Sequence, residues 1–135
     1  MASVGNVFNV TPHAIDIFDK DGKTLLAKIP SNGELRLKST EQRSLEPMQA
    51  EGCTIPLITP QVFVGLDTSG AGYASWAAHP TGLFVVSQPM AAYLTTEGRQ
   101  ELGSRLLYTP ATGPGYGVRD AGGKILGCKA LEKYY

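Results

Sequence analysis

Three polar residues at alternate positions near the start of the chain could do chemistry together. They are Asn9, Thr11 and His13, and alternate side chains of a β-strand project from the same face. Such a row could bind a ligand, with His13 as a hydrogen-bond donor or a general base. In the alternative, Asn9 and Thr11 satisfy backbone groups beside Pro12, and His13 fixes a sheet edge. The row is therefore a candidate ligand site with a purely structural alternative.

Basic and aromatic side chains could pair with phosphate groups and stack on a base. The predicted ligand-binding residues are Asn9, Thr11, His13, Arg36, Arg105, Tyr116, Arg119 and Lys129. Any anion site should draw on Arg119 and Lys129, with His13 nearby. In a tight hairpin, Arg119 opposes a residue near Lys124 or Ile125. It therefore meets Lys129 only if the sheet curls or a second subunit closes the pocket. Scattered surface charge is the alternative, because these residues form no diagnostic motif.

Catalytic and metal-binding patterns are weaker. Cys128 with His13 could form a thiolate nucleophile, but Cys128 alternates with Leu126 and Ala130, which indicates a buried, structural thiol. The two histidines, His13 and His79, have no partner at metal-ligand spacing, and no carboxylate cluster supplies further ligands. We therefore predict no catalytic residue, no metal and no cofactor.

Length and charge limit the remaining classes of function. A chain of 135 residues predicts a single β-rich domain over residues 1–135. Its twelve Lys and Arg balance twelve Asp and Glu, which argues against bulk binding of nucleic acid. The charge-free stretch 68–96 is too often interrupted by Gly and Pro to form a membrane helix. The N-terminal residues show no secretory signal, so we expect a cytoplasmic location with reduced cysteines.

Hydrophobic alternation with a period of two predicts a mainly β fold, an antiparallel barrel or sandwich. We expect a hairpin over 14–18 and 23–29, strands over 34–38, 55–60 and 61–66, a central strand over 83–87 and a final hairpin over 118–131. One or two short helices are expected near residues 89–107. Residues 39–52 and 69–80 are expected to be loops.

Four segments resemble a known family when taken in order. They are residues 9–15 (Asn-Val-Thr-Pro-His-Ala-Ile), 29–33 (Ile-Pro-Ser-Asn-Gly), 85–87 (Val-Val-Ser), and 118–120 with 127–131 (Val-Arg-Asp and Gly-Cys-Lys-Ala-Leu). The chain resembles small uncharacterised phage and bacterial proteins that begin with Asn-Leu-Thr-Pro-His and end with Gly-Cys-Arg. Here Val10 replaces the Leu, and Lys129 replaces the Arg, which removes the planar fork suited to bidentate anion binding. The resemblance implies a phage source, with the host cytoplasm as the location.

Together these observations favour a non-catalytic binding protein. The predicted function is a homo-oligomer that sequesters a small nucleotide-derived host immune signal, with Arg or Lys on its phosphates and Tyr or Trp on its base. An oligomer is expected because the stretch 68–96 would leave an apolar loop surface on a monomer, and because β edges need covering. The alternative is a structural or assembly module, such as a virion accessory domain. A Cys–His hydrolase is the third possibility.

Overall fold

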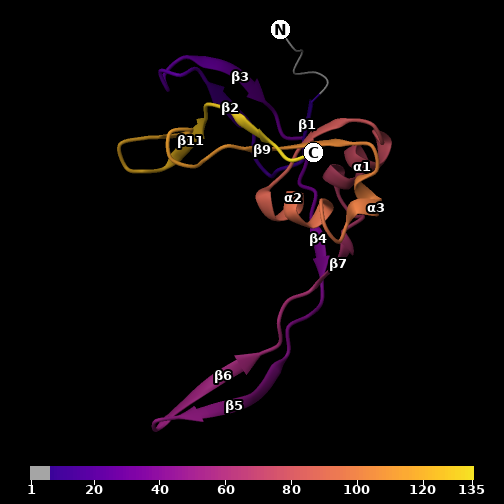
Figure 1. Cartoon of the computed structure of the whole chain (residues 1–135), viewed down its shortest axis with the longest axis vertical. Coiled ribbons are helices and arrows are strands. Elements are labelled where there is room, and N and C mark those ends of the chain that lie inside the picture. The colour runs from indigo at the N-terminus through magenta and orange to yellow at the C-terminus, as the bar shows by residue number, and fades with distance from the viewer. Residues whose placement is uncertain (1–6) are drawn as a thin grey trace.

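The computed structural model describes residues 7–135, which form a compact body and a long projecting arm (Figure 1). The first sheet has the order β1-β8-β9-β12, built from β1 (Val7–Asn9), β8 (Leu83–Val85), β9 (Leu106–Pro110) and β12 (Leu131–Lys133). The second sheet has the order β10-β11-β2-β3, built from β10 (Gly117–Arg119), β11 (Ile125–Cys128), β2 (Ile15–Phe18) and β3 (Leu25–Ile29). A ribbon of β4 (Leu37–Ser39) with β7 (Phe63–Leu66) leads into the arm, and a ribbon of β5 (Ser44–Ala50) with β6 (Cys53–Ile58) forms it.

The central strand β8 organises the core. It runs parallel to both β1 and β9, which confirms the central strand expected over 83–87. Phe84 and Val86 pack in one apolar cluster with residues of the helices, whereas Val85 packs in a second cluster with Ile15, Ile29 and Cys128 of the second sheet. Apolar side chains on both faces of β8 therefore explain its continuous hydrophobic run.

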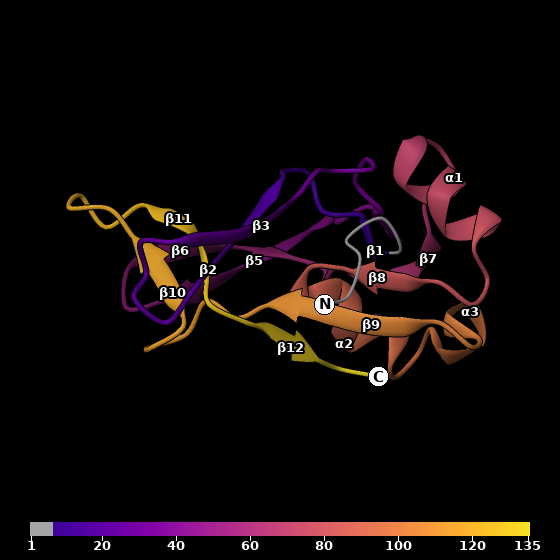
Figure 2. The ribbon, with the colours of Figure 1, turned by 90° about the horizontal axis from the view of Figure 1, so that it is seen from above.

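Three helices complete the body: α1 (Ala71–Ala78), α2 (Gln88–Leu94) and α3 (Arg99–Leu102). The short helices expected near 89–107 are confirmed as α2 and α3. The Ser87 hydroxyl accepts a hydrogen bond from the Met90 N–H at 3.3 Å and so caps α2, while Pro89 occupies the first turn, where its missing N–H does no harm. Seen from above, α1 and α3 lie at the opposite end of the body from β10 and β11 (Figure 2). None of the described helices is long and apolar enough to span a membrane.

The stretch 68–96 corrects two expectations. Residues 69–80 are not a surface loop, because residues 71–78 form α1 and bury Trp76. The stretch does not present an apolar loop surface either, since Met90, Leu94 and the strand β8 lie in the core. Its low charge therefore reflects burial within one chain, and it gives no support to an oligomer.

Both predicted hairpins are confirmed, since β2 pairs antiparallel with β3 and β10 with β11. The first turn is held by the Asp21 carboxylate, which accepts hydrogen bonds from the N–H groups of Lys23 and Thr24 at 2.8 and 2.9 Å. A parallel contact of β11 with β2 joins the hairpins into one sheet. The mainly β class is thus confirmed, but the sheets do not close into a barrel within residues 7–135. The expected antiparallel order is wrong for the first sheet, where β8 runs parallel to β1 and β9, because helices α2 and α3 connect β8 to β9.

The expected loop over 39–52 is wrong, because residues 44–50 form β5. This strand pairs with β6 in an antiparallel ribbon whose turn, Glu51 and Gly52, has positive φ at both positions (46° and 80°), as two-residue hairpin turns prefer. Pro47 masks the strand in the sequence, and the register shifts between Leu45 and Met48 to accommodate it. We call residues 40–61 the arm, and Figure 1 shows it extending from the body along the longest axis of the molecule.

Candidate functional site

The Asn9–Thr11–His13 row forms a hydrogen-bonded turn. Strand β1 ends at Asn9, so the three side chains do not share a strand face. Asn9 is fully buried, and its Nδ2 donates to the carbonyls of His13 and Ile29 at 2.9 and 3.2 Å. Its Oδ1 accepts from the N–H and the hydroxyl of Thr11 at 3.0 and 2.6 Å. With the Asn9 amide fully used in this way, the geometry supports the structural alternative for Asn9 and Thr11.

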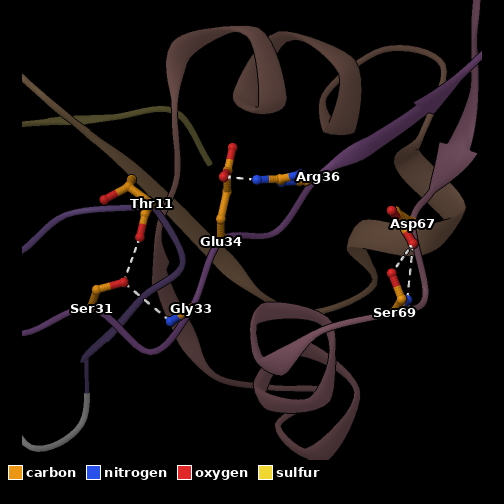
Figure 3. A network of polar contacts seen from close by, with 7 residues as sticks. All are labelled: Thr11, Ser31, Gly33, Glu34, Arg36, Asp67 and Ser69. Carbon is orange, nitrogen blue, oxygen red and sulfur yellow. Dashed lines mark hydrogen bonds and ion pairs between the residues drawn. The ribbon is translucent and has the colours of Figure 1, made fainter.

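The Pro-Ser-Asn-Gly segment interlocks with this turn. The Asn9 N–H donates to Asn32 Oδ1 at 2.9 Å, and the Asn32 N–H donates to the Asn9 carbonyl at 2.7 Å. Ser31 Oγ donates to the Thr11 carbonyl at 2.6 Å and accepts from the Gly33 N–H at 3.1 Å (Figure 3). Two of the segments that carry the family resemblance therefore meet in one network, and their residue types are explained by the turn that they hold.

His13 lines a cavity of about 260 Å³ at the junction of β2 and β11, which we call the lobe cavity. Its wall is mainly apolar and includes Ile125, Leu126 and Cys128, with Asp16 and Thr112 as further polar residues. The Asp16 carboxylate lies 3.8 Å from Lys28 Nζ in a partly exposed ion pair. The N-terminal and C-terminal segments of the resemblance thus converge at this cavity.

Cys128 is confirmed as a buried residue, with 1% of its surface exposed. Burial raises the pKa of its thiol above the ordinary value, which outweighs the hydrogen bonds with the backbone of Ala130 and Ala111. A thiol with a raised pKa stays protonated near neutral pH and is a poor nucleophile. Although His13 and Cys128 line the same cavity, this environment does not favour a Cys–His hydrolase.

Three predicted anion ligands lie on the β10–β11 hairpin. Arg119 pairs with Ile125, as expected, and its Nη1 donates to the Gly123 carbonyl at 2.8 Å. The Lys129 N–H donates to the Tyr116 carbonyl at 2.8 Å, and the Tyr116 ring is exposed. Neither Arg119 nor Lys129 is among the residues that line the lobe cavity in the described chain. One chain therefore pairs the backbones of Tyr116 and Lys129 but does not join these residues to His13 in one pocket.

Arg105 is committed to the fold of the body. It is 8% exposed, and its guanidinium donates to the carbonyls of Glu101 and Trp76 at 2.8 and 2.6 Å. The guanidinium carbon also lies 4.1 Å from the centre of the Trp76 ring, in cation–π geometry. Burial lowers the pKa of Arg105 from its ordinary value. These contacts tie α1 to α3 and leave no free face of Arg105 for a ligand.

Arg36 lines a polar cleft of about 240 Å³ beside the start of α1 (Figure 3). Its Nε lies 3.0 Å from Glu34 Oε2. Asp67 lines the same cleft, and hydrogen bonds from Ser69, at 2.6 Å from its hydroxyl and 2.9 Å from its N–H, lower the pKa of the Asp67 carboxyl. Two carboxylates against one guanidinium make this cleft unfavourable for a phosphate.

The arm is a candidate interaction surface that sequence reasoning missed. Every residue of β5 except Ala50, and every residue of β6, is exposed. Five large apolar side chains lie on it: Leu45, Met48, Ile55, Leu57 and Ile58, with exposed fractions of 37% to 59%. An isolated two-stranded hairpin is only marginally stable in water, and exposed apolar patches mark interaction surfaces. The available signal was the apolar run over 55–60, which predicted a strand but not its isolation from the sheets of the body.

A second apolar hollow lies beside the base of the arm, and we call it the base groove. It has a volume of about 340 Å³ and is lined by Phe63, Ala92, Tyr93 and Glu97 among others. Tyr93 donates its hydroxyl hydrogen to Glu101 at 3.0 Å, so two glutamates lie at or near this groove. The base groove is therefore apolar in its wall and acidic at its rim.

Searches against protein-family models, curated proteins and solved structures found no significant match to this chain. Within residues 7–135, no three His, Cys, Asp or Glu side chains come close enough to hold a metal ion.

Proposed function

We propose that the protein is a non-catalytic assembly module, such as a virion accessory domain, that self-associates by docking its arm on a second copy. The observation that carries the proposal is the arm with five exposed large apolar side chains. Complete burial of such a side chain stabilises by about 1.5–3 kcal/mol, so completing the burial of a half-exposed one is worth about 1 kcal/mol. Five of them supply about 5 kcal/mol per arm before the cost of association.

Charge favours a second copy as the partner. The arm carries three acidic residues, Glu41, Glu46 and Glu51, and one basic residue, Arg43. Its net charge is therefore −2, and since the whole chain has no net charge, the remainder carries +2. A second copy thus offers the complementary charge as well as apolar surface. In this proposal the two four-stranded sheets form a sandwich-like scaffold that presents the arm in the cytoplasm.

Light scattering of the purified chain tests this function. We expect the molar mass to exceed that of one 14.4 kDa chain and to rise with concentration. A variant with Leu45→Ser, Ile55→Ser and Leu57→Ser should have the mass of one chain. The matched control carries Leu106→Ser and Tyr135→Ser, which change exposed apolar residues outside the arm and should leave the mass of the assembly unchanged.

Capture of a small nucleotide-like anion by an oligomer is a second candidate. It is supported by Tyr116, Arg119 and Lys129, which place an aromatic ring and two cations on one hairpin. A second subunit would have to complete the pocket. Native mass spectrometry after incubation with a panel of nucleotide signals tests this candidate, because a retained nucleotide adds its own mass to the assembly. An unchanged mass with every nucleotide would argue against it.

A further inference from the structure

We propose that the arm of one copy docks on the lobe cavity and the lysine-rich apolar surface around it on the second sheet of another copy. This inference rests on the proposed function, because the arm is the ligand. We call the second sheet with its turns the lobe.

The lobe carries an exposed apolar surface that matches the arm. Leu25 and Leu26 of β3 and Ile125 and Leu126 of β11 are each 43% to 59% exposed. Ile125 and Leu126 also line the lobe cavity, whose volume is about 260 Å³. Small-molecule sites are typically about 300–1,000 Å³, so a cavity of this size suits an aliphatic side chain better than a nucleotide.

The lobe also carries the cations that the arm lacks. Residues 14–30 and 117–130 contain six basic and four acidic residues, a net charge of +2. The described structure pairs neither Lys20, Lys23, Lys124 nor Lys129 with a carboxylate within 4.0 Å. Hydrogen bonds from Thr24 and Lys23, with a smaller contribution from the charge of Lys129, lower the pKa of the Asp21 carboxyl, so Lys129 already faces an acid of its own chain. Turn hydrogen bonds occupy carboxylate oxygens of three of the acids, Asp19, Asp21 and Asp120.

The arm presents the complementary acids. Neither Glu46 nor Glu51 has an ion pair within residues 7–135. Docking would bring these carboxylates to the unpaired lysines of the lobe while the apolar side chains of the arm cover Leu126 and its neighbours. Complementary charge steers association and fixes which surfaces meet. Asp16 also lies on the wall of the cavity, 3.8 Å from Lys28 Nζ, and its buried Oδ1 has no hydrogen-bond partner within the described residues.

The base groove is a less suitable acceptor even though it is larger. Glu97 lines it, and Glu101 is hydrogen-bonded to Tyr93 in its wall. An acidic arm would meet like charge there, which disfavours docking. The polar cleft at Arg36 would also repel an acidic arm, because the carboxylates of Glu34 and Asp67 line it. Of these three hollows, the lobe cavity has an apolar wall and lies in a sheet whose residues 14–30 and 117–130 carry a net charge of +2.

The placement of the two surfaces makes the contact intermolecular. Figure 1 shows the tip of the arm at one end of the longest axis and β2, β3 and β11 near the other end. The arm of a chain therefore cannot fold back on its own lobe in this structure. Arm and lobe are different surfaces, so two copies can exchange arms across a twofold axis, or each arm can dock on the next copy in a ring or an open filament.

Charge reversal with complementation tests this acceptor. One variant carries Glu46→Lys and Glu51→Lys in the arm, and the other carries Lys124→Glu and Lys129→Glu in the lobe. We expect each alone to weaken self-association at least tenfold in sedimentation velocity. A mixture of the two should restore assembly, because each arm then faces a lobe of opposite charge. The matched control, Glu97→Lys with Glu132→Lys, adds the same charge elsewhere and should not weaken it.

A second pair of variants tests the acceptor without a change of charge. Leu126→Ser alters the lobe cavity, and Leu106→Ser alters an exposed leucine of similar accessibility on the first sheet. Only Leu126→Ser should weaken self-association. Normal assembly of both the lobe charge variant and Leu126→Ser, with failure of the arm variant, would overturn the lobe as acceptor and leave the proposed function standing. Normal assembly of the arm variants, or no assembly of the unmodified chain, would overturn the proposed function itself.

Discussion

Replacement of Asn9 by alanine should destabilise the fold more than any change at an exposed predicted ligand residue. The Asn9 side chain is buried and bonds the Thr11 N–H and the carbonyls of His13 and Ile29. In Asn9→Ala, the Thr11 N–H and the Ile29 carbonyl lose this partner, and each such buried group costs about 1–3 kcal/mol. We expect a loss of about 2–5 kcal/mol in the free energy of unfolding, a large fraction of typical domain stability.

Urea unfolding followed by circular dichroism measures this loss. His13→Ala is the matched control, because it removes an exposed ring of the same motif but keeps the carbonyl that Asn9 binds. Its stability should stay within about 0.5 kcal/mol of the unmodified chain. If Asn9→Ala lost no more than His13→Ala, the motif would not act as a structural turn and the reasoning would fail.

Three further predictions concern single sites. Cys128→Ala should cost about 1 kcal/mol through lost packing, and thiol labelling of the folded chain should modify Cys53 but not the buried Cys128. Hydrogen bonds from Ser69 lower the pKa of the Asp67 carboxyl in the folded state, so Asp67 stabilises the fold above its ordinary pKa of 3.8 and this contribution is lost as the pH falls through the folded value. Asp67→Asn should therefore reduce the fall in the free energy of unfolding between neutral and acidic pH, measured by urea unfolding. If the nucleotide candidate holds, Arg119→Ala should weaken binding by roughly 10- to 150-fold in calorimetry, and unchanged affinity in both Arg119→Ala and Lys129→Ala would place any such site elsewhere.

The elements predicted correctly are those whose pattern depends on local sequence. Hairpins β2–β3 and β10–β11 have alternating apolar residues and turns with Asp and Gly, so backbone chemistry alone specifies them. The strand β8 has apolar side chains on both faces because clusters form on both sides of it. These features follow from periodicity, which requires no knowledge of the tertiary structure.

The elements predicted wrongly depend on long-range context. Gly70 and Gly72 suggest a loop over 69–80, yet Gly72 packs so closely on the backbone of Glu34 that a Cβ there would collide with the Glu34 carbonyl. Small residues in α1 thus reflect close packing, which a single sequence does not reveal. The strand β5 was hidden by its polar residues and Pro47, because it pairs only with β6 and buries little.

The candidate site was predictable only in part. The sequence correctly predicts that Asn9 and His13 lie close together. Their spacing does not show that the Asn9 amide is buried while the His13 ring is exposed. Arg105 and Arg119 look equivalent in the sequence, whereas the structure buries the first under Trp76 and places the second on an exposed hairpin. Exposure, which depends on the whole fold, makes this distinction.

The most direct test of the central claim is the molar mass of the unmodified chain compared with that of the Leu45→Ser, Ile55→Ser and Leu57→Ser variant, measured by light scattering across a concentration series. Self-assembly through the arm predicts a mass that rises above 14.4 kDa for the unmodified chain and stays at 14.4 kDa for the variant. Equal masses for the two proteins at every concentration, whether monomeric or assembled, would contradict the role of the arm.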